Sequence, residues 1–330
     1  MERGRPQRDI LGVRGRLESK ILLDETIPEA VKKILRAHAR AMLVSERGVR
    51  AGDVDKVHDM RVAVRRMRTA LRIFRDFLDR DEFRPFIREL KTLGRALGPV
   101  RDLDVWISNA QHFRESLQAR AGFDLDVVVR EWQANRKQLH QQAIEHLESP
   151  RYQRFVRDFT AFLRDPLAEA PPAVTKKGKV RPLDLRHLGP VILYERLAAF
   201  RAYEGWLDSK DVPLRRYHRF RIEVKRLRYT LEFFTDVTGP EAEPLIDSLK
   251  DVQDHLGELR EAWMTANVLR TIVRSENGKG KGIVRRPGVA AYLASREHLR
   301  DDLRGSFPAI WAKARNPEFN RRFATIAAAF

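Results

Sequence analysis

The chain of 330 residues carries 64 Lys and Arg against 46 Asp and Glu, and its formal charge of +18 indicates an acidic partner such as nucleic acid, anionic lipid or a phosphate polymer. It has no cysteine, which excludes a disulfide, a zinc site with thiolate ligands and a cysteine nucleophile, and which favours a cytoplasmic location. No apolar run approaches the roughly 20 residues that a membrane-spanning helix needs, so we expect no association with a membrane.

Helical periodicity runs through the first half of the chain. Apolar residues recur at the spacing of an amphipathic helix, and no stretch shows the alternation of a strand. Gly98-Pro99 and Gly122 are predicted to end two of the helices. We expect helices over residues 28–47, 53–79, 82–97, 101–119, 124–147 and 152–163, of which the first four form a four-helix unit.

A segment rich in Pro, Lys and Gly, residues 165–182, separates this half from a second helical half. The helical pattern returns over residues 190–207, 213–235, 241–256 and 259–274, and a loop of Gly and Lys at 277–282 and terminal helices follow. The sequence therefore predicts an all-α protein with a basic N-terminal tail (1–26), a first helical half (27–164), a linker (165–186) and a second helical half (187–330).

One basic block occurs in both halves. It begins at His58 and recurs 160 residues later at His218, and both copies keep histidine, arginine, valine, a cation, arginine, an apolar residue and arginine in register. Such a register indicates that architecture and chemistry were duplicated together. Further matches lie outside the block, at Arg36 and Arg196, at Lys91 and Lys250, and at Arg101 and Arg260.

Each copy of the block predicts a helix with one cationic face. At about 100° per residue, spacings of three and four bring the cations into one stripe beside an apolar face. The first stripe holds His58, Arg61, Arg65, Arg68 and Arg72, and the second holds His218, Arg221, Lys225 and Arg228. Arg66 and Arg226 project to the side of their stripes and are predicted to serve a neighbouring helix.

The stripes suit a ligand that consists of phosphates. Like charges at these spacings destabilise a helix unless acids or a polyanion neutralise them. A solvated basic face would explain one such helix, but duplication together with the histidine favours a binding surface. Arginine can hold two phosphate oxygens at once, and histidine can donate to phosphate. Neither stripe carries the aromatic residues on which bases stack, so inorganic polyphosphate fits better than DNA or RNA.

The two copies also carry a family resemblance. The repeated His-x-x-Arg-x-x-x-Arg/Lys-Arg-x-Arg helix, followed by Lys91, Leu97-Gly98 and Arg101-Asp102-Leu103-Asp104, resembles the conserved histidine α-helical domain family, CHAD. The resemblance covers residues 28–274. It implies two pseudo-symmetric, antiparallel helical bundles whose basic helices line a central groove or pore. It also implies non-catalytic binding of inorganic polyphosphate, from which we expect association with polyphosphate granules and their proteins.

The resemblance assigns binding roles by motif match to His58, Arg61, Arg65, Arg66, Arg68, Lys91, His218, Arg221, Lys225, Arg226, Arg228 and Lys250. Arg36, Arg72, Arg101 and Arg196 join this set because they lie in a stripe or in the register of the repeat. Two departures concern the second copy, where Glu232 stands in place of Arg72 and Glu261 in place of Asp102. We therefore expect the first half to be more cationic and the two halves to bind unequally.

Other functions remain open. A protein that compacts nucleic acid would use the same phosphate contacts, and a scaffold at a polyphosphate granule would add a protein partner. A metal-dependent polyphosphate hydrolase would need clustered carboxylates. Asp102 and Asp104 point to different sides of one helix, so they are predicted to cap it or to pair with arginine. We predict a protein that is not an enzyme and has no metal and no cofactor.

Overall fold

The computed structural model describes residues 20–117, 119–164, 183–207, 212–277 and 286–330. Helices account for almost all of these ranges, and within them the β contacts amount to one isolated bridge between Thr26 and Asp184. The predicted all-α fold class is confirmed. Most of the predicted tail, residues 165–182 of the predicted linker and residues 278–282 of the predicted loop lie outside the described residues.

Within the described residues, each half of the chain contains five main helices. The first half contains α1 (Ile27–Arg50), α2 (Val54–Ile73), α3 (Arg80–Arg114), α4 (Ala119–Glu148) and α5 (Pro150–Arg164). The second contains α6 (Leu185–Arg201), α8 (Leu214–Phe233), α10 (Glu243–Asn277), α11 (Pro287–Ala314) and α12 (Pro317–Ala327). Short pieces lie between them, at η1 (Arg75–Phe77), α7 (Glu204–Leu207), α9 (Thr235–Thr238) and η2 (Gly239–Ala242). α2 and α8 each have 20 residues, and α3 and α10 each have 35.

Three helix breaks predicted from the sequence are wrong. Gly122 was predicted to end a helix, but α4 begins at Ala119 and continues through Gly122. α3 continues through Gly98-Pro99, and α10 continues through Gly257, so the predicted pairs of helices at 82–97 and 101–119 and at 241–256 and 259–274 are each one helix. The reason is that the buried face does not stop there, because Leu97, Val100 and Leu103 are all buried. Burial of each such side chain contributes about 1.5–3 kcal/mol to stability. The three side chains together therefore outweigh the cost of an interior proline, which is about 3 kcal/mol.

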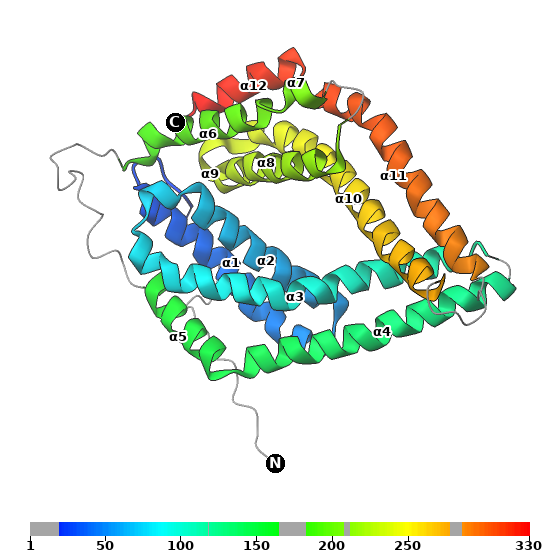
Figure 1. Ribbon diagram of the computed structural model, residues 1–330. Helices are drawn as coiled ribbons and strands as arrows, with labels where there is room; N and C mark the ends of the chain where they lie inside the picture. The colour runs from blue at the N-terminus through cyan, green and yellow to red at the C-terminus, as the bar shows by residue number, and fades with distance from the viewer. Residues whose placement is uncertain (1–19, 118, 165–182, 208–211, 278–285) are drawn as a thin grey trace.

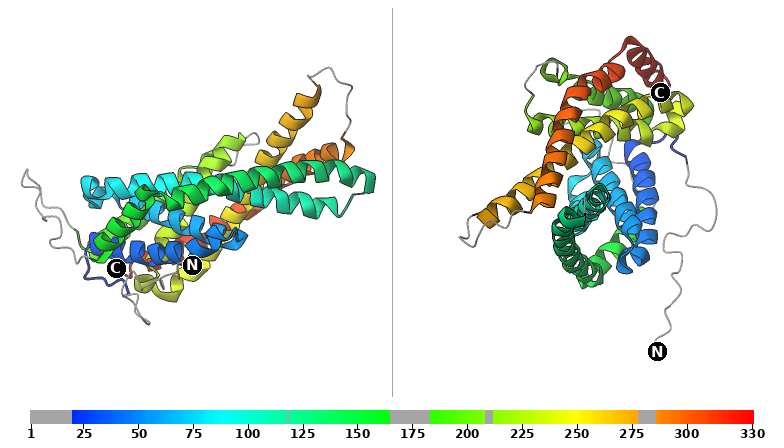
Figure 2. Two further views of the ribbon diagram at one scale, coloured as in Figure 1. Left: turned by 90° about the horizontal axis from the view of Figure 1, so that it is seen from below. Right: turned by 90° about the vertical axis from the view of Figure 1, so that its right-hand side faces the viewer.

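The two halves meet on opposite sides of a ring-like arrangement of helices (Figure 1). α2 contacts α8 on one side, and α11 contacts α3 and α4 on the other. The larger core spans both halves, and within it Phe74 packs edge-on against its counterpart in the repeat, Phe234, with 5.8 Å between ring centroids. A smaller core, which includes Trp132 and Tyr292, joins α3, α4, α10 and α11. Figure 2 shows α10 and α11, in gold and orange, side by side at this end of the molecule.

The residues at the edges of the predicted tail and linker belong to the folded body. The Ile21 amide donates to the Asp236 carboxylate at 3.0 Å, and the Ile27 amide donates to the Leu183 carbonyl at 2.8 Å. α6 begins at Leu185, ahead of the predicted start at Pro190, which lies inside the helix. Leu185 is fully buried, and this packing extends α6 toward its N-terminus.

The N-terminus of α2 is capped by Asp53, whose carboxylate accepts from the amides of Asp55 at 2.9 Å and Lys56 at 3.1 Å. Asp53→Ala should lower the free energy of unfolding by about 1 kcal/mol, because two amides at the helix end lose their acceptor. Urea denaturation followed by circular dichroism measures this loss. Asp53→Asn keeps an oxygen acceptor and should retain most of the stability, so an equal loss in both variants would contradict the capping role.

Candidate functional site

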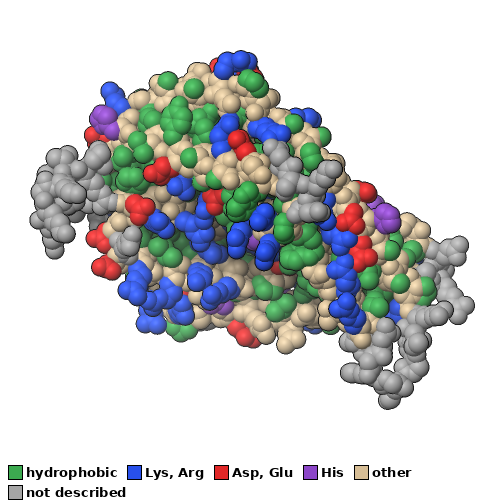
Figure 3. All heavy atoms as spheres, turned by 45° about the horizontal axis from the view of Figure 1, so that its top comes forward, with side chains coloured by type: hydrophobic (Ala, Val, Ile, Leu, Met, Phe, Trp, Pro, Cys, Tyr) green, Lys and Arg blue, Asp and Glu red, His purple; other side chains and the backbone are tan. Residues whose placement is uncertain are grey.

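The two cationic stripes lie on α2 and α8, which contact each other at the boundary between the halves. Both helices turn an apolar face into the larger core, with Val57, Met60 and Val64 on α2 and Phe220, Val224 and Leu227 on α8. Because those faces are fixed inward, the stripes beside them are directed to the region where the two helices meet. Figure 3 shows Lys and Arg side chains gathered across the middle of one face of the molecule.

Six cations from four helices form what we call the cation cluster: Arg61 and Arg65 of α2, Arg101 of α3, Arg221 and Lys225 of α8, and Arg260 of α10. Burial lowers the pKa of Arg221, the charges of Arg65, Arg260 and Arg61 lower it as well, and together they bring it to about 10. Residues of both stripes therefore act on one another at short range. The stripes face each other, which their spacing in the sequence could not establish.

Lys225 lies at the centre of these electrostatic interactions. Burial lowers the pKa of its ammonium group, the charges of Arg221, Arg65, Arg260 and Arg61 lower it as well, and together they bring it from 10.5 to about 6. Arg61 lies 3.9 Å from Asp102, and this carboxylate offsets only part of the positive charge. The protonated cluster is therefore electrostatically unfavourable on its own, and a bound polyanion would relieve the repulsion.

The two histidines lie beside the cluster in corresponding places. Burial lowers the pKa of His58, with Arg101 and Arg65 as the next causes, and burial lowers that of His218, with Arg260 as the next cause. Their pKa values thus fall below the usual 6.5, so both rings are mainly neutral at pH 7. In that form each ring offers one N–H donor to a ligand.

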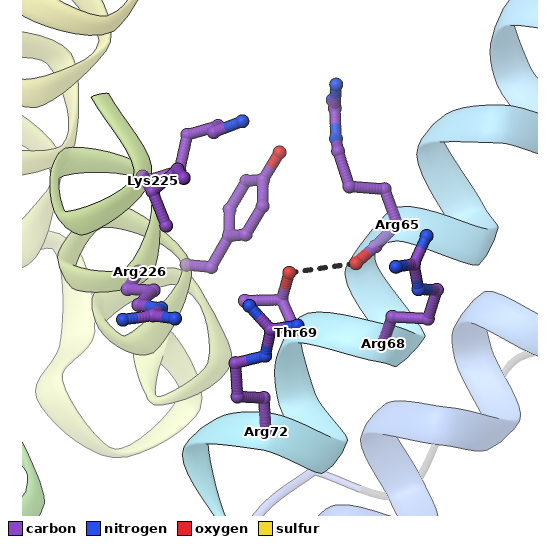
Figure 4. A pocket seen from close by; sticks show the side chains of 8 residues that line it. Arg65, Arg68, Thr69, Arg72, Lys225 and Arg226 are labelled. Atoms are coloured by element: carbon purple, nitrogen blue, oxygen red, sulfur yellow. Dashed lines mark hydrogen bonds between the residues drawn. The ribbon is translucent and has the colours of Figure 1, made fainter. Parts of the chain in front are cut away.

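A cavity of about 190 Å³ lies between the two stripes (Figure 4). Its lining residues are Arg65, Arg68, Thr69 and Arg72 from α2 and Ile222, Lys225, Arg226 and Tyr229 from α8. Burial lowers the pKa of Arg68, and the charges of Arg72 and Arg95 lower it further. The cavity wall combines guanidinium and ammonium groups from both halves of the chain, which suits an anion with several phosphates.

Two arginines of the predicted set form structural contacts instead of lining this cavity. Arg66 lies 2.9 Å from the Glu232 carboxylate, and Arg228 pairs with the same carboxylate and donates to the Gln253 side-chain oxygen at 3.2 Å. Both guanidinium groups stack on the ring of Tyr229, at 5.1 Å and 4.7 Å from its centroid. Glu232 therefore joins α2 to α8 and neutralises arginines that hold the interface together.

The remaining predicted residues lie elsewhere or have partners of their own. Arg36 donates to the Leu163 carbonyl at the end of α5, at 2.6 Å and 3.2 Å. Arg196 pairs with Glu195 at 3.2 Å, and Arg226 pairs with Glu223 at 2.6 Å while it lines the cavity. Lys91 on α3 and Lys250 on α10 are exposed.

Arg260 is a cluster residue that the predicted site set lacks. It acts on the pKa values of His218, Arg221 and Lys225. The repeat carried a signal for it, because Arg260 is the counterpart of Arg101. Its neighbour on α10, Gly257, gives the Arg221 guanidinium room, since a Cβ added there would lie 3.3 Å from its Nη2.

The two aspartates considered as metal ligands each lie beside an arginine. Asp104 accepts from Arg136 at 2.8 Å, and Asp102 lies near Arg61. Their predicted pairing with arginine is confirmed. In the ranges that the structure describes, no three His, Asp or Glu side chains are grouped to hold a metal ion. No helix in those ranges is both long and apolar enough to span a bilayer.

Comparison with known proteins identifies the fold. The structure is similar to the crystal structure of the CHAD domain from the plant Ricinus communis, with a TM-score of 0.62 and 22% identity, covering 94% of each chain. It is also similar to PptA from Streptomyces chartreusis, with a TM-score of 0.62 and 22% identity, covering 87% of this chain and 99% of that one. No match was found among curated proteins. The CHAD domain family matches residues 33–270, most of the chain, and the protein therefore belongs to the CHAD domain family.

Proposed function

We propose that this protein binds inorganic polyphosphate without turning it over, and that this binding associates it with polyphosphate granules. The observation that carries the proposal is the cation cluster, in which cations of both halves converge at one place although each depresses the pKa of its neighbours. Membership of the CHAD domain family, which is linked to polyphosphate, supports the same ligand.

The chemistry of the cluster favours a phosphate chain over other acidic partners. Its arginines can each contact two phosphate oxygens, and they stay charged at any physiological pH. The described cavity between the stripes has one aromatic lining residue, Tyr229, and the guanidinium groups of two arginines already stack on its ring. The walls thus offer contacts to phosphates but no platform for nucleobases.

A competition experiment tests the choice of ligand. Labelled long-chain polyphosphate is bound to the protein at fixed salt and displaced with unlabelled polyphosphate or double-stranded DNA. We expect polyphosphate to compete at a phosphate concentration at least about tenfold lower, and the logarithm of the binding constant to fall steeply with the logarithm of the salt concentration. If the two polymers displace the label equally well, the proposed preference for polyphosphate is wrong and nucleic acid becomes the favoured ligand.

A second measurement addresses the non-catalytic part of the proposal. Polyphosphate is incubated with the protein and magnesium or manganese, and released phosphate is quantified alongside chain length. We expect neither phosphate release nor shortening of the polymer. Release that scales with protein concentration and is lost when the cation cluster is changed would make the protein an enzyme.

A further inference from the structure

Tyr229 has a buried hydroxyl group that the cationic stripes do not account for. Tyr229 is 1% exposed, and its hydroxyl oxygen has no hydrogen-bond partner among the residues that the structure describes. A buried hydroxyl without a partner costs free energy, so such groups are normally satisfied by protein, water or ligand. Tyr229 lines the cavity between α2 and α8, which is the place where an acceptor could reach it.

The ring of Tyr229 is held in a defined position. The guanidinium groups of Arg66 and Arg228 lie over the ring, and the Glu232 carboxylate pairs with both of them. Two stacked cations that share one carboxylate restrict the rotation of the ring and fix the direction of its hydroxyl. The contacts of Arg66 and Arg228 thus position a third residue rather than a ligand.

The hydroxyl is directed toward the cation cluster. Helical side chains lean toward the N-terminus of their helix, so the Tyr229 side chain extends toward Lys225, one turn earlier on α8. Both residues line the same cavity, and the Tyr229 hydroxyl also acts on the pKa of Arg221. The guanidinium groups around it are donors and cannot accept its proton.

The other hydroxyl in the cavity wall is already used. Thr69, the counterpart of Tyr229 in the repeat, donates to the Arg65 carbonyl at 2.9 Å (Figure 4). The other lining residues that the structure describes are cations and Ile222. Of the two hydroxyl groups in the described cavity wall, that of Tyr229 is therefore the one without an acceptor.

We propose that the Tyr229 hydroxyl donates a hydrogen bond to a phosphate oxygen of the polymer bound at the cation cluster. This inference rests on the proposed function and adds a contact of a different kind. Lys225 and Arg65, which border the same cavity, are drawn toward the phosphates, and an anionic oxygen then supplies the acceptor that the hydroxyl lacks. A neutral donor displaces no counterion, so it strengthens binding without adding to the salt dependence.

Tyr229→Phe tests this contact because it removes the hydroxyl and keeps the ring on which the two guanidinium groups stack. We expect the affinity for long-chain polyphosphate to fall about tenfold, with the slope of log K against log salt unchanged. The matched control is Tyr292→Phe, which removes another buried hydroxyl without a partner, in the smaller core outside the cavity. This control should bind like the wild type.

A spectroscopic readout separates a direct contact from a change in folding. Polyphosphate should shift the near-ultraviolet tyrosine absorbance of the wild type and of Tyr292→Phe, and Tyr229→Phe should lose this shift while its thermal unfolding remains cooperative. If the wild type binds and Tyr229→Phe binds equally well, this inference fails alone. If the wild type does not bind polyphosphate, the proposed function fails and the inference falls with it. A changed salt slope in Tyr229→Phe would also overturn it, because the cations would then have moved.

Discussion

Replacing Arg61, Arg65, Arg221 and Lys225 with glutamate should reduce the affinity for polyphosphate by at least about a thousandfold at physiological salt. The four side chains belong to the cation cluster and come equally from α2 and α8. The change removes four phosphate contacts and adds four negative charges at the same place. The slope of log K against log salt should also become shallower by about three to four units. Fluorescence anisotropy with labelled polyphosphate, repeated over a range of salt concentrations, measures both quantities.

The matched control carries the same change in net charge at a different place. Its four replaced cations, which are exposed on α3, α4, α5 and α11, are Arg88, Lys137, Arg154 and Lys313. Changing these to glutamate should weaken binding by less than about tenfold, since screened surface charges act weakly at a distance. Equal losses in the two variants would mean that overall charge, rather than the cluster, determines binding. Circular dichroism of both proteins establishes that they are folded.

The position of the stripes could be predicted because a helix converts spacing directly into faces. The intervals from His58 to Arg65 and from His218 to Lys225 fix which side chains share a face, whatever the helix packs against. The apolar residues beside them indicated which face turns inward, and the structure buries those residues. The same reasoning could not bring the two stripes together, because that contact joins helices from different halves.

The partners of individual arginines depend on contacts between helices that are distant in the sequence. They could therefore not be predicted from the sequence. Arg228 shares a stripe with Arg221, yet it is 8% exposed and bound by Glu232 and Gln253, the latter from α10. The sequence indicated that Glu232 weakens the second half as a binding surface. Its carboxylate in fact pairs with Arg66 and Arg228, which shows that an acid in a stripe can serve the interface between helices.

Local signals also failed where packing is continuous. Gly98-Pro99 predicts a helix end from conformational preference alone, but buried residues on both sides keep α3 intact. In the second half, Gly257 serves a close approach, since the Arg221 guanidinium occupies the space beside it. Which glycine ends a helix and which makes room for a neighbour is decided by a packing partner distant in the sequence.

The affinity for polyphosphate should fall as the pH rises from about 6 to 8, by up to about 100-fold, because of Lys225. Burial and the charges of Arg221, Arg65, Arg260 and Arg61 lower its pKa to about 6, so the ligand-free protein is mainly uncharged at this residue above that pH. Bound phosphates favour the ammonium form and raise the pKa, so binding takes up a proton. Below about pH 6 the lysine is charged with or without ligand, and its contribution to the pH dependence disappears. Titration calorimetry in two buffers of different ionisation enthalpy counts the protons taken up.

Lys225→Arg separates this mechanism from a general effect of pH on the polymer. An arginine keeps its charge across the range, so the variant should bind more tightly than the wild type at pH 8 and lose most of the proton uptake that Lys225 causes. His58 and His218, whose pKa values are lowered by burial, would then account for the proton uptake that remains. An affinity that falls equally with pH in Lys225→Arg would show that another group carries the proton.

The stability of the ligand-free wild type should follow the opposite trend to the affinity and increase from pH 6 toward 10. The unfolded chain keeps the lysine proton up to about 10.5, whereas the folded chain releases it near 6.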